Sequence, residues 1–239
     1  MPSPNVVLVT GAGSGVGRAC ALKLAAEGWS VAMLGRRTQP LNATLALATH
    51  SASGHIATFP CDIGEPAAVA AVAKSMLKTF GRIDALVNAA GTNIGRRSLD
   101  VLTPADFQAT VATNLYGAFN CAHAVLPAMR RQGGGTIINI NSEAGRKASA
   151  KAGAAYVASK FGLAGLTQTI NAEERARGIR ACSIFPGDIN TPLLDKRPVP
   201  PPRKARARML QPEDIAACVW LALSLPARAV VEELLVRPL

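Results

Sequence analysis

The sequence predicts an α/β fold: one doubly wound parallel sheet of about seven strands with helices on both faces. Short apolar runs rich in Val and Ile alternate with longer helical patterns along all 239 residues. Apolar residues make up 49% of the chain but aromatic residues only 4%, as expected when Ala, Val, Leu and Ile fill the space between sheet and helices. Because no repeat or change of composition marks a boundary, residues 1–239 are predicted to form a single domain.

The alternation gives each element its expected range. Strands are expected at 6–10, 30–34, 55–59, 83–87, 136–141, 179–185 and 233–236. Helices are expected at 18–27, 41–49, 65–80, 104–131, 154–176 and 212–225. Gly28 follows the first helix as a stop signal, Pro66 suits the first turn of the third, and Thr103-Pro104 begins the fourth. Segment 195–208 is rich in proline and arginine and shows no periodicity, so we expect a mobile loop there.

Several classes of protein are disfavoured by composition. No apolar run approaches the roughly 20 residues that span a bilayer, and residues 1–5 carry no basic region typical of a signal peptide. The five cysteines are scattered, without a Cys-x-x-Cys pair or a zinc-type spacing. We therefore expect a cytoplasmic protein with buried free thiols, no membrane association and no metal site.

The net charge of +11 indicates an anionic partner. Nucleic acid is one alternative, and it would predict steeply salt-dependent binding. Aromatic residues that stack on bases are few, however, and a phosphorylated cofactor is a sufficient anion. We therefore predict a small-molecule partner and no nucleic acid.

A glycine-rich turn joins the first strand to its helix. Backbone amides and the positive end of the helix would face a pyrophosphate there, and side chains would block its approach. The spacing is Gly11-x-x-x-Gly15-x-Gly17, with Val16 where the common dinucleotide-binding pattern has its last glycine. In this strand–turn–helix context the pattern predicts a Rossmann-type cofactor site that includes Gly11, Ser14, Gly15, Val16 and Gly17.

The end of the second strand carries Arg36 and Arg37 and no carboxylate. An acidic residue there would bind the ribose hydroxyls of NAD, whereas guanidinium groups suit a 2′-phosphate. NADP(H) is therefore the favoured cofactor, with NAD(H) as the alternative.

The candidate catalytic group is Tyr156, four residues before Lys160 on one face of a predicted helix. A phenol has a pKa of about 10, and a neighbouring ammonium would lower that pKa by favouring the phenolate. Such a tyrosine can exchange a proton with an alcohol or a carbonyl. Ser142, just past the strand at 136–141, is expected to hold the same oxygen.

These motifs together resemble the short-chain dehydrogenases/reductases over nearly the whole chain. The resemblance rests on Thr10-Gly11-x-x-x-Gly15-x-Gly17, Asp62, Asn88-Ala89-Ala90-Gly91, Asn114, Ser142, Tyr156-x-x-x-Lys160 and Pro186-Gly187. Each motif is weak alone, but their common order and spacing make the set specific.

The resemblance implies roles for individual residues. It makes Tyr156 the general acid/base, and Lys160 the group that lowers its pKa and binds the nicotinamide ribose. It places Ser142 on the substrate oxygen and gives Asn114 a part in holding a water that links Lys160 to solvent. The cofactor would further be contacted by Asp62 and Ile63 at the adenine, Asn88, Ala89 and Gly91 along the cleft, and Pro186, Gly187, Ile189 and Thr191 around the nicotinamide.

The resemblance also implies a variable substrate loop at 192–209 and a homotetramer or homodimer built on the long helices. The predicted function is NADP(H)-dependent hydride transfer to a carbonyl or from a secondary alcohol. The alternative is a regulator that binds NADPH without turnover. The substrate itself is not predicted, although Asn93, Ile94, Glu143 and Ala144 are expected to shape its pocket.

Overall fold

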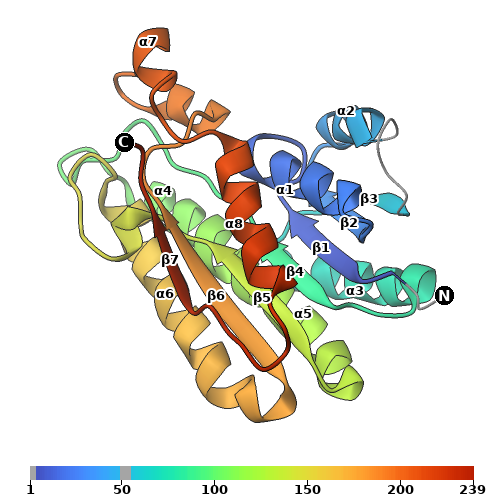
Figure 1. Cartoon of the computed structure of the whole chain (residues 1–239). Coiled ribbons are helices and arrows are strands. Elements are labelled where there is room, and N and C mark those ends of the chain that lie inside the picture. The colour runs from blue at the N-terminus through green and yellow to red at the C-terminus, as the bar shows by residue number, and fades with distance from the viewer. Residues whose placement is uncertain (1–3, 49–54) are drawn as a thin grey trace.

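A computed structural model describes residues 4–48 and 55–239 of the chain. Among these residues, seven parallel strands form one sheet in the order β3-β2-β1-β4-β5-β6-β7 (Figure 1). The predicted fold class is confirmed. The strands are β1 (Val6–Thr10), β2 (Ser30–Gly35), β3 (Ile56–Pro60), β4 (Ala85–Asn88), β5 (Gly135–Ile140), β6 (Ile179–Pro186) and β7 (Glu233–Val236).

Helices cover both faces of the sheet (Figure 1). On one face lie α1 (Gly15–Ala26), α2 (Thr38–Ala48) and α8 (Pro212–Ser224). On the other lie α3 (Pro66–Phe80), α5 (Gly117–Gln132) and α6 (Ala154–Glu174).

The central strand β1 shows how the sequence builds two cores at once. All five of its residues are buried. Val7 and Val9 pack into the core beneath α1 and α8, whereas Val6 and Leu8 pack into the core beneath α3 and α5. Successive side chains of a strand point to opposite faces, so a strand covered on both sides is a nearly continuous apolar run, here Val6 to Val9.

Two predicted elements differ from the structure. The helix expected at 104–131 is divided into α4 (Pro104–Val111), a π-helical segment (Ala112–Tyr116) and α5. The segment expected to be a loop at 195–208 contains the end of a 3₁₀ helix (Pro192–Lys196) and the short helix α7 (Arg203–Arg206). A single helical turn is too short for a periodic pattern to reveal. The expected end of the second helix at Thr49 lies outside the described residues.

All five cysteines are free. Cys20 and Cys182 belong to the core beneath α1 and α8, and Cys61 and Cys121 to the opposite core. Burial raises the pKa of the Cys20, Cys121 and Cys182 thiols to about 12.

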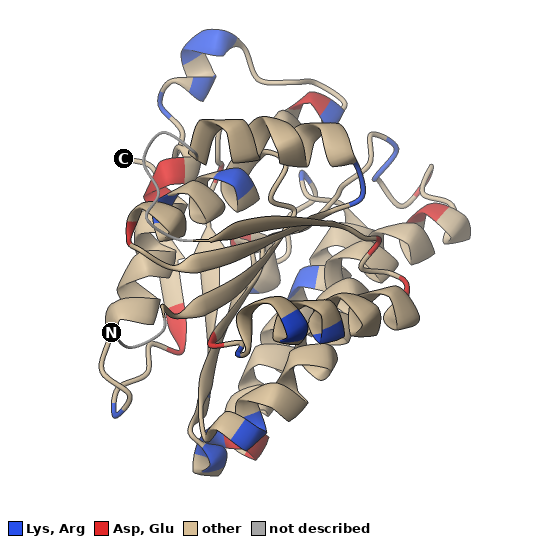
Figure 2. Cartoon of the chain, turned by 90° about the vertical axis from the view of Figure 1, so that its right-hand side faces the viewer, with Lys and Arg blue, Asp and Glu red and all other residues tan. Residues whose placement is uncertain are grey.

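Charged residues lie mainly at helix ends and on loops, and the basic helix α7 stands out from the body of the molecule (Figures 1 and 2). Within residues 4–48 and 55–239, no helix combines the length and the apolar character needed to cross a bilayer.

Candidate active site

Two adjoining cavities lie at the carboxyl ends of the strands, where ligands bind in open α/β sheets. The glycine-turn cavity has a volume of about 350 Å³ and lies between the turn after β1 and the ends of β2 and β4. The loop cavity, of about 980 Å³, is bounded by residues 141–152, residues 186–197 and the segment after β7. Tyr156 lines both cavities, so its side chain marks their junction.

The glycine turn is a cradle in which side chains have no room. Gly11 has φ of 67°, and a Cβ on it would lie 2.9 Å from the Cα of Ala90. Gly15 has φ of 51°, and a Cβ there would lie 3.3 Å from Cγ2 of Thr191. Both residues line the cavity together with Ser14 and Val16, so the turn offers the close backbone approach that a pyrophosphate requires.

Gly17 was predicted to be part of the cofactor site, but it lies outside the glycine-turn cavity. It is buried in α1 and does not line the glycine-turn cavity, and a Cβ on it would clash with the carbonyl of Gly11. Its structural effect is therefore to let α1 pack closely against the turn.

Three side chains hold the turn in place: Thr10, which belongs to the quoted glycine motif, and Arg18 and Thr44, which the motif analysis missed. The Thr10 hydroxyl accepts hydrogen bonds from the amides of Ala89 (3.1 Å) and Ala90 (3.0 Å), which joins the ends of β1 and β4. Arg18 donates to the carbonyl of Gly13 at 2.6 Å, and Thr44 donates to the carbonyl of Ala12 at 3.0 Å. Thr44 comes from α2, and no local sequence signal connects it to the turn.

The far end of this cavity carries the predicted arginines. Arg36 and Arg37 are exposed at the end of β2, and Asp62 and Ile63 also line the cavity. Arg36 lies 3.9 Å from the Asp62 carboxylate, with both side chains more than half exposed. Among the described residues Arg37 has no ion-pair partner, so its charge is available to a ligand.

The position of Asn88 differs from the expectation that its side chain lies along the cofactor cleft. Ala89 and Gly91 line the glycine-turn cavity as predicted, but the Asn88 side chain is buried and does not line it. Its amide donates to Asn139 at 2.9 Å and to the carbonyl of Ala118 at 3.3 Å. It therefore links β4 to β5 and α5 beneath the cavity.

Lys160 is buried one helical turn after Tyr156 in α6. Its Nζ lies 5.7 Å from the centroid of the Tyr156 ring and donates a hydrogen bond to the carbonyl of Ile140 at 2.8 Å. Burial lowers the pKa of Lys160 to about 8 because the charged form loses its hydration.

The pKa of Tyr156 is raised, which is opposite to the sequence-based expectation. Burial of the phenol raises this pKa, and a hydrogen bond with Ser142 and the positive charges of Arg197 and Arg97 oppose the rise only in part. The Lys160 ammonium is not among the causes of the shift. In this structure the phenol is therefore held in its neutral, proton-donating form.

Ser142 lines the loop cavity and caps a short 3₁₀ helix (Glu143–Gly145). Its hydroxyl accepts from the Ala144 amide at 3.2 Å, and its own amide donates to the Asn141 side chain at 3.0 Å. Asn141, which the motif analysis did not single out, therefore fixes the backbone at this position.

Asn114 lies in the π-helical segment and lines neither cavity. Its side chain accepts from the Thr92 amide at 2.7 Å and donates to the Thr92 carbonyl at 2.9 Å and to Ser159 at 3.1 Å. A Cβ on Gly91 would lie 3.6 Å from Asn114 Oδ1 and 4.0 Å from Lys160 Nζ, so Asn114 lies next to two residues that line the glycine-turn cavity. The water relay expected of Asn114 stays a prediction.

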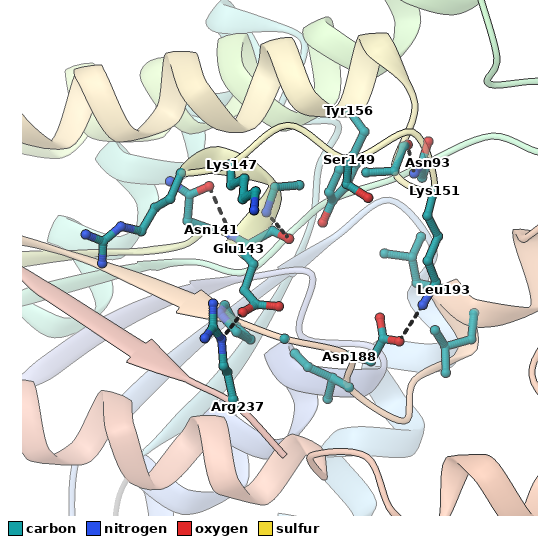
Figure 3. Close-up of a pocket in the computed structure, with 18 of the residues that line it drawn as sticks. Asn93, Asn141, Glu143, Lys147, Ser149, Lys151, Tyr156, Asp188, Leu193 and Arg237 are labelled. Atoms are coloured by element: carbon teal, nitrogen blue, oxygen red, sulfur yellow. Dashed lines mark hydrogen bonds and ion pairs between the residues drawn. The ribbon is translucent and has the colours of Figure 1, made fainter. Parts of the chain in front are cut away.

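The remaining predicted residues surround the loop cavity (Figure 3). Pro186 and Gly187 line it, and Ile189 and Thr191 line both cavities. The expected pocket residues Asn93, Glu143 and Ala144 are also in its wall, but Ile94 is not. The motif analysis missed Arg237 and Pro238, which reach this wall from beyond β7, and Arg237 forms an ion pair with Glu143 (Figure 3).

Comparisons with known proteins bear on the family and the fold of the chain. A model of the short chain dehydrogenase family matches residues 5–199. Sepiapterin reductase of Chlorobaculum tepidum is 36% identical, in an alignment that covers 98% of this chain and 96% of that protein. The crystal structure of levodione reductase superposes with a TM-score of 0.91 at 33% identity and covers 98% of this chain and 96% of its own. A metagenomic short-chain oxidoreductase crystallised in complex with NADP gives a TM-score of 0.85 at 34% identity, covering 99% of this chain and 98% of that one.

Proposed function

The chain belongs to the short-chain dehydrogenase/reductase family and is an NAD(P)-dependent oxidoreductase, and from this premise we propose that it uses NADP(H) to interconvert a carbonyl and a secondary alcohol, with Tyr156 as the general acid/base. The single observation that carries the proposal is the position of Tyr156 at the junction of the two cavities. A group there can touch a substrate in the loop cavity while the glycine-turn cavity holds the cofactor.

The residues of the glycine-turn cavity fit a dinucleotide. The turn at Gly11 and Gly15 leaves space where a Cβ would otherwise stand, and Thr191 faces it from the opposite wall. When bound, the cofactor supplies or accepts hydride at its nicotinamide ring. The residues proposed to hold it are Gly11, Ser14, Gly15, Val16, Arg36, Arg37, Asp62, Ile63, Ala89, Gly91, Tyr156, Lys160, Pro186, Gly187, Ile189 and Thr191.

The proton chemistry follows from the state of the phenol. In the reducing direction Tyr156 must give a proton to the carbonyl oxygen, and its raised pKa keeps that proton in place until the oxygen becomes basic. The Ser142 hydroxyl, on the same cavity wall, donates a second hydrogen bond to the reacting oxygen. Lys160, close behind the ring, is the group through which the proton is replaced.

The choice of NADP(H) rests on the end of β2. Arg36 and Arg37 line the cavity where a 2′-phosphate would lie, and no carboxylate follows the strand directly. Asp62 offsets part of the charge of Arg36, so Arg37 is the stronger candidate for the phosphate contact.

The proposal is tested by following the absorbance of reduced nicotinamide with a panel of ketones, aldehydes and alcohols, using both NADP(H) and NAD(H). We expect turnover of at least one carbonyl, with NADPH preferred. Tight binding of NADPH without turnover of any compound would favour the alternative, a regulator that binds the cofactor and has no substrate.

We further propose that the chain forms a homodimer or homotetramer. Tyr116, Phe119 and Phe161 are exposed aromatic residues on or beside α5 and α6, and association would remove their surfaces from water. Light scattering after size-exclusion chromatography is the measurement, and a monomer at micromolar concentration would contradict this proposal.

A further inference from the structure

The wall of the loop cavity carries more positive charge than the carboxylates around it can neutralise. Glu143 and Asp188 are the acidic residues of this wall. The basic residues that line it are Arg97, Arg146, Lys147, Lys151, Arg197 and Arg237.

The carboxylates are already occupied. Glu143 is paired with Arg237, and Asp188 lies between Lys151 (2.7 Å) and Arg197 (2.5 Å). Those hydrogen bonds outweigh the effect of burial and lower the pKa of Asp188, so this carboxylate is ionised at neutral pH. Because a single charge serves two cations, the group keeps one positive charge in excess.

Arg97 adds a second uncompensated charge. It is 7% exposed, and within residues 4–48 and 55–239 its guanidinium donates only to carbonyl oxygens, those of Ile94 (2.7 Å), Lys196 (2.8 Å) and Lys151 (3.4 Å). Burial and the nearby Arg197 lower the pKa of Arg97, which means that the site disfavours its charge. A bound anion would relieve that repulsion.

Lys147 provides the third charge. Among the described residues its ammonium has no hydrogen-bond or ion-pair partner, in contrast to Lys151 on the same loop. In Figure 3 Lys147 and Lys151 extend from this loop on the two sides of the Ser149 and Tyr156 side chains. The remaining cation of the wall, Arg146, lies 3.6 Å from the carboxylate of Glu233, a residue that does not line the cavity.

Two of these cations lie near the reacting group as well as lining the cavity. Arg97, which has no carboxylate partner among the described residues, and Arg197 of the Asp188 group both act on the Tyr156 phenol, and Asp188 opposes them. All three are therefore close enough to influence a ligand bound there. A cavity of about 980 Å³ has room for a substrate that extends from Tyr156 to the loop bearing Lys147.

We propose that the carbonyl substrate carries a carboxylate or phosphate group, which binds against Lys147 while its carbonyl faces Tyr156. This inference rests on the function proposed above and adds the substrate class. It also assigns the positive loop cavity to substrate selection, separately from the arginines that face the cofactor.

The first test compares kcat/KM for 4-acetylbenzoate, its methyl ester and 4-acetylphenyl phosphate, all with NADPH. We expect at least one anionic compound to exceed the neutral ester by about tenfold or more, and the better anion tells carboxylate from phosphate. Lys147→Gln should lower that ratio about tenfold, and rising salt should lower it further. Lys74→Gln, an exposed lysine of α3 remote from the cavity, is the matched control and should keep the ratio. Turnover of the ester equal to or above that of both anions would overturn the inference while leaving the proposed function intact.

A second test does not depend on turnover. Calorimetry of Tyr156→Phe with NADP⁺ measures the binding of benzoate, phenyl phosphate and neutral benzamide. We expect an anion to bind at least tenfold more tightly than benzamide, and Lys147→Gln in the same background to weaken only the anion. Equal binding of all three would overturn the inference, even where no carbonyl compound is reduced and the proposed function has failed.

Discussion

The two cavities that meet at Tyr156 are built in different ways. The glycine-turn cavity is made largely of strand ends and backbone, held by Thr10, Arg18 and Thr44. The loop cavity is made of side chains on loops, including Arg97 and a residue from beyond β7, Arg237. The first is a rigid cradle for a ligand that many proteins share, whereas the second is a charged chamber whose lining can change without disturbing the sheet.

The largest expected effect separates the functions of the two cavities. Tyr156→Phe should lower kcat by about 10³-fold, because general acid catalysis contributes on this scale, and should change NADPH affinity little. Steady-state kinetics and a fluorescence titration of NADPH measure the two effects. Tyr116→Phe, at the other tyrosine of the chain, is the control and should keep full activity. Retained turnover in the Tyr156 variant would assign the proton to another group.

Lys160 allows a test of the buried charge at the junction. Its pKa is about 8 in the folded protein and 10.5 when unperturbed, so between these pH values the unfolded chain binds more protons. The buried ammonium of Lys160 therefore destabilises the folded state most below pH 8, and this destabilisation decreases as pH rises toward 10.5. Lys160→Met removes this cost, so its stability advantage over the wild type should shrink by roughly 3 kcal/mol across that range.

Urea unfolding of both proteins at several pH values measures the difference between their free energies of unfolding. The buried thiols are common to both proteins, so their titration cancels in this difference. Lys74→Met, at an exposed position, should show a difference that does not vary with pH. The same flat profile for Lys160→Met would contradict the assignment of a depressed pKa.

The rigidity of the glycine-turn cavity is tested by adding one methyl group. Gly17→Ala would force a Cβ against the carbonyl of Gly11 and should destabilise the fold by about 2 kcal/mol. Gly165→Ala, on an open position of α6, should instead stabilise it by about 0.5 kcal/mol, because alanine restricts the unfolded chain. Denaturant midpoints compare the two variants. Equal midpoints would mean that the turn yields to α1 more readily than the structure indicates.

The smallest effect concerns the cofactor phosphate. Arg37→Ala should lower the ratio of kcat/KM for NADPH over NADH by about tenfold, the loss of one exposed charge-assisted contact. Arg36→Ala should lower the same ratio less, because Asp62 already offsets that charge. A ratio unchanged in both variants would place the phosphate elsewhere.

The comparison also explains what could be predicted from the sequence. The strands and the glycine turn were predictable because β1 is apolar from Val6 to Val9 and the turn residues are contiguous. Arg18 and Thr44 were not, because their contacts with the turn depend on how α1 and α2 pack. The inward position of Asn88 and the π-helical segment at Asn114 likewise depend on tertiary contacts that no local pattern carries.

Electrostatics was the least predictable property. The spacing of Tyr156 and Lys160 correctly places both on α6, but the effect of burial on each pKa depends on the residues packed around them. The charge of the loop cavity has the same character, since Arg97, Lys147 and Arg197 come from separate segments. Counting charged residues in the sequence gives the excess of positive charge, but only the fold shows that part of this charge is concentrated around the loop cavity.

The distribution of the free thiols has a practical consequence for studying this chain. Each face of the sheet encloses cysteines that a modifying reagent reaches only when that layer detaches: Cys20 and Cys182 on one side, Cys121 on the other. The rate at which each is labelled under native conditions therefore reports the opening of its own layer. Identical labelling rates would identify a single cooperative unit, and unequal rates would show which face of the sheet is exposed first by local unfolding.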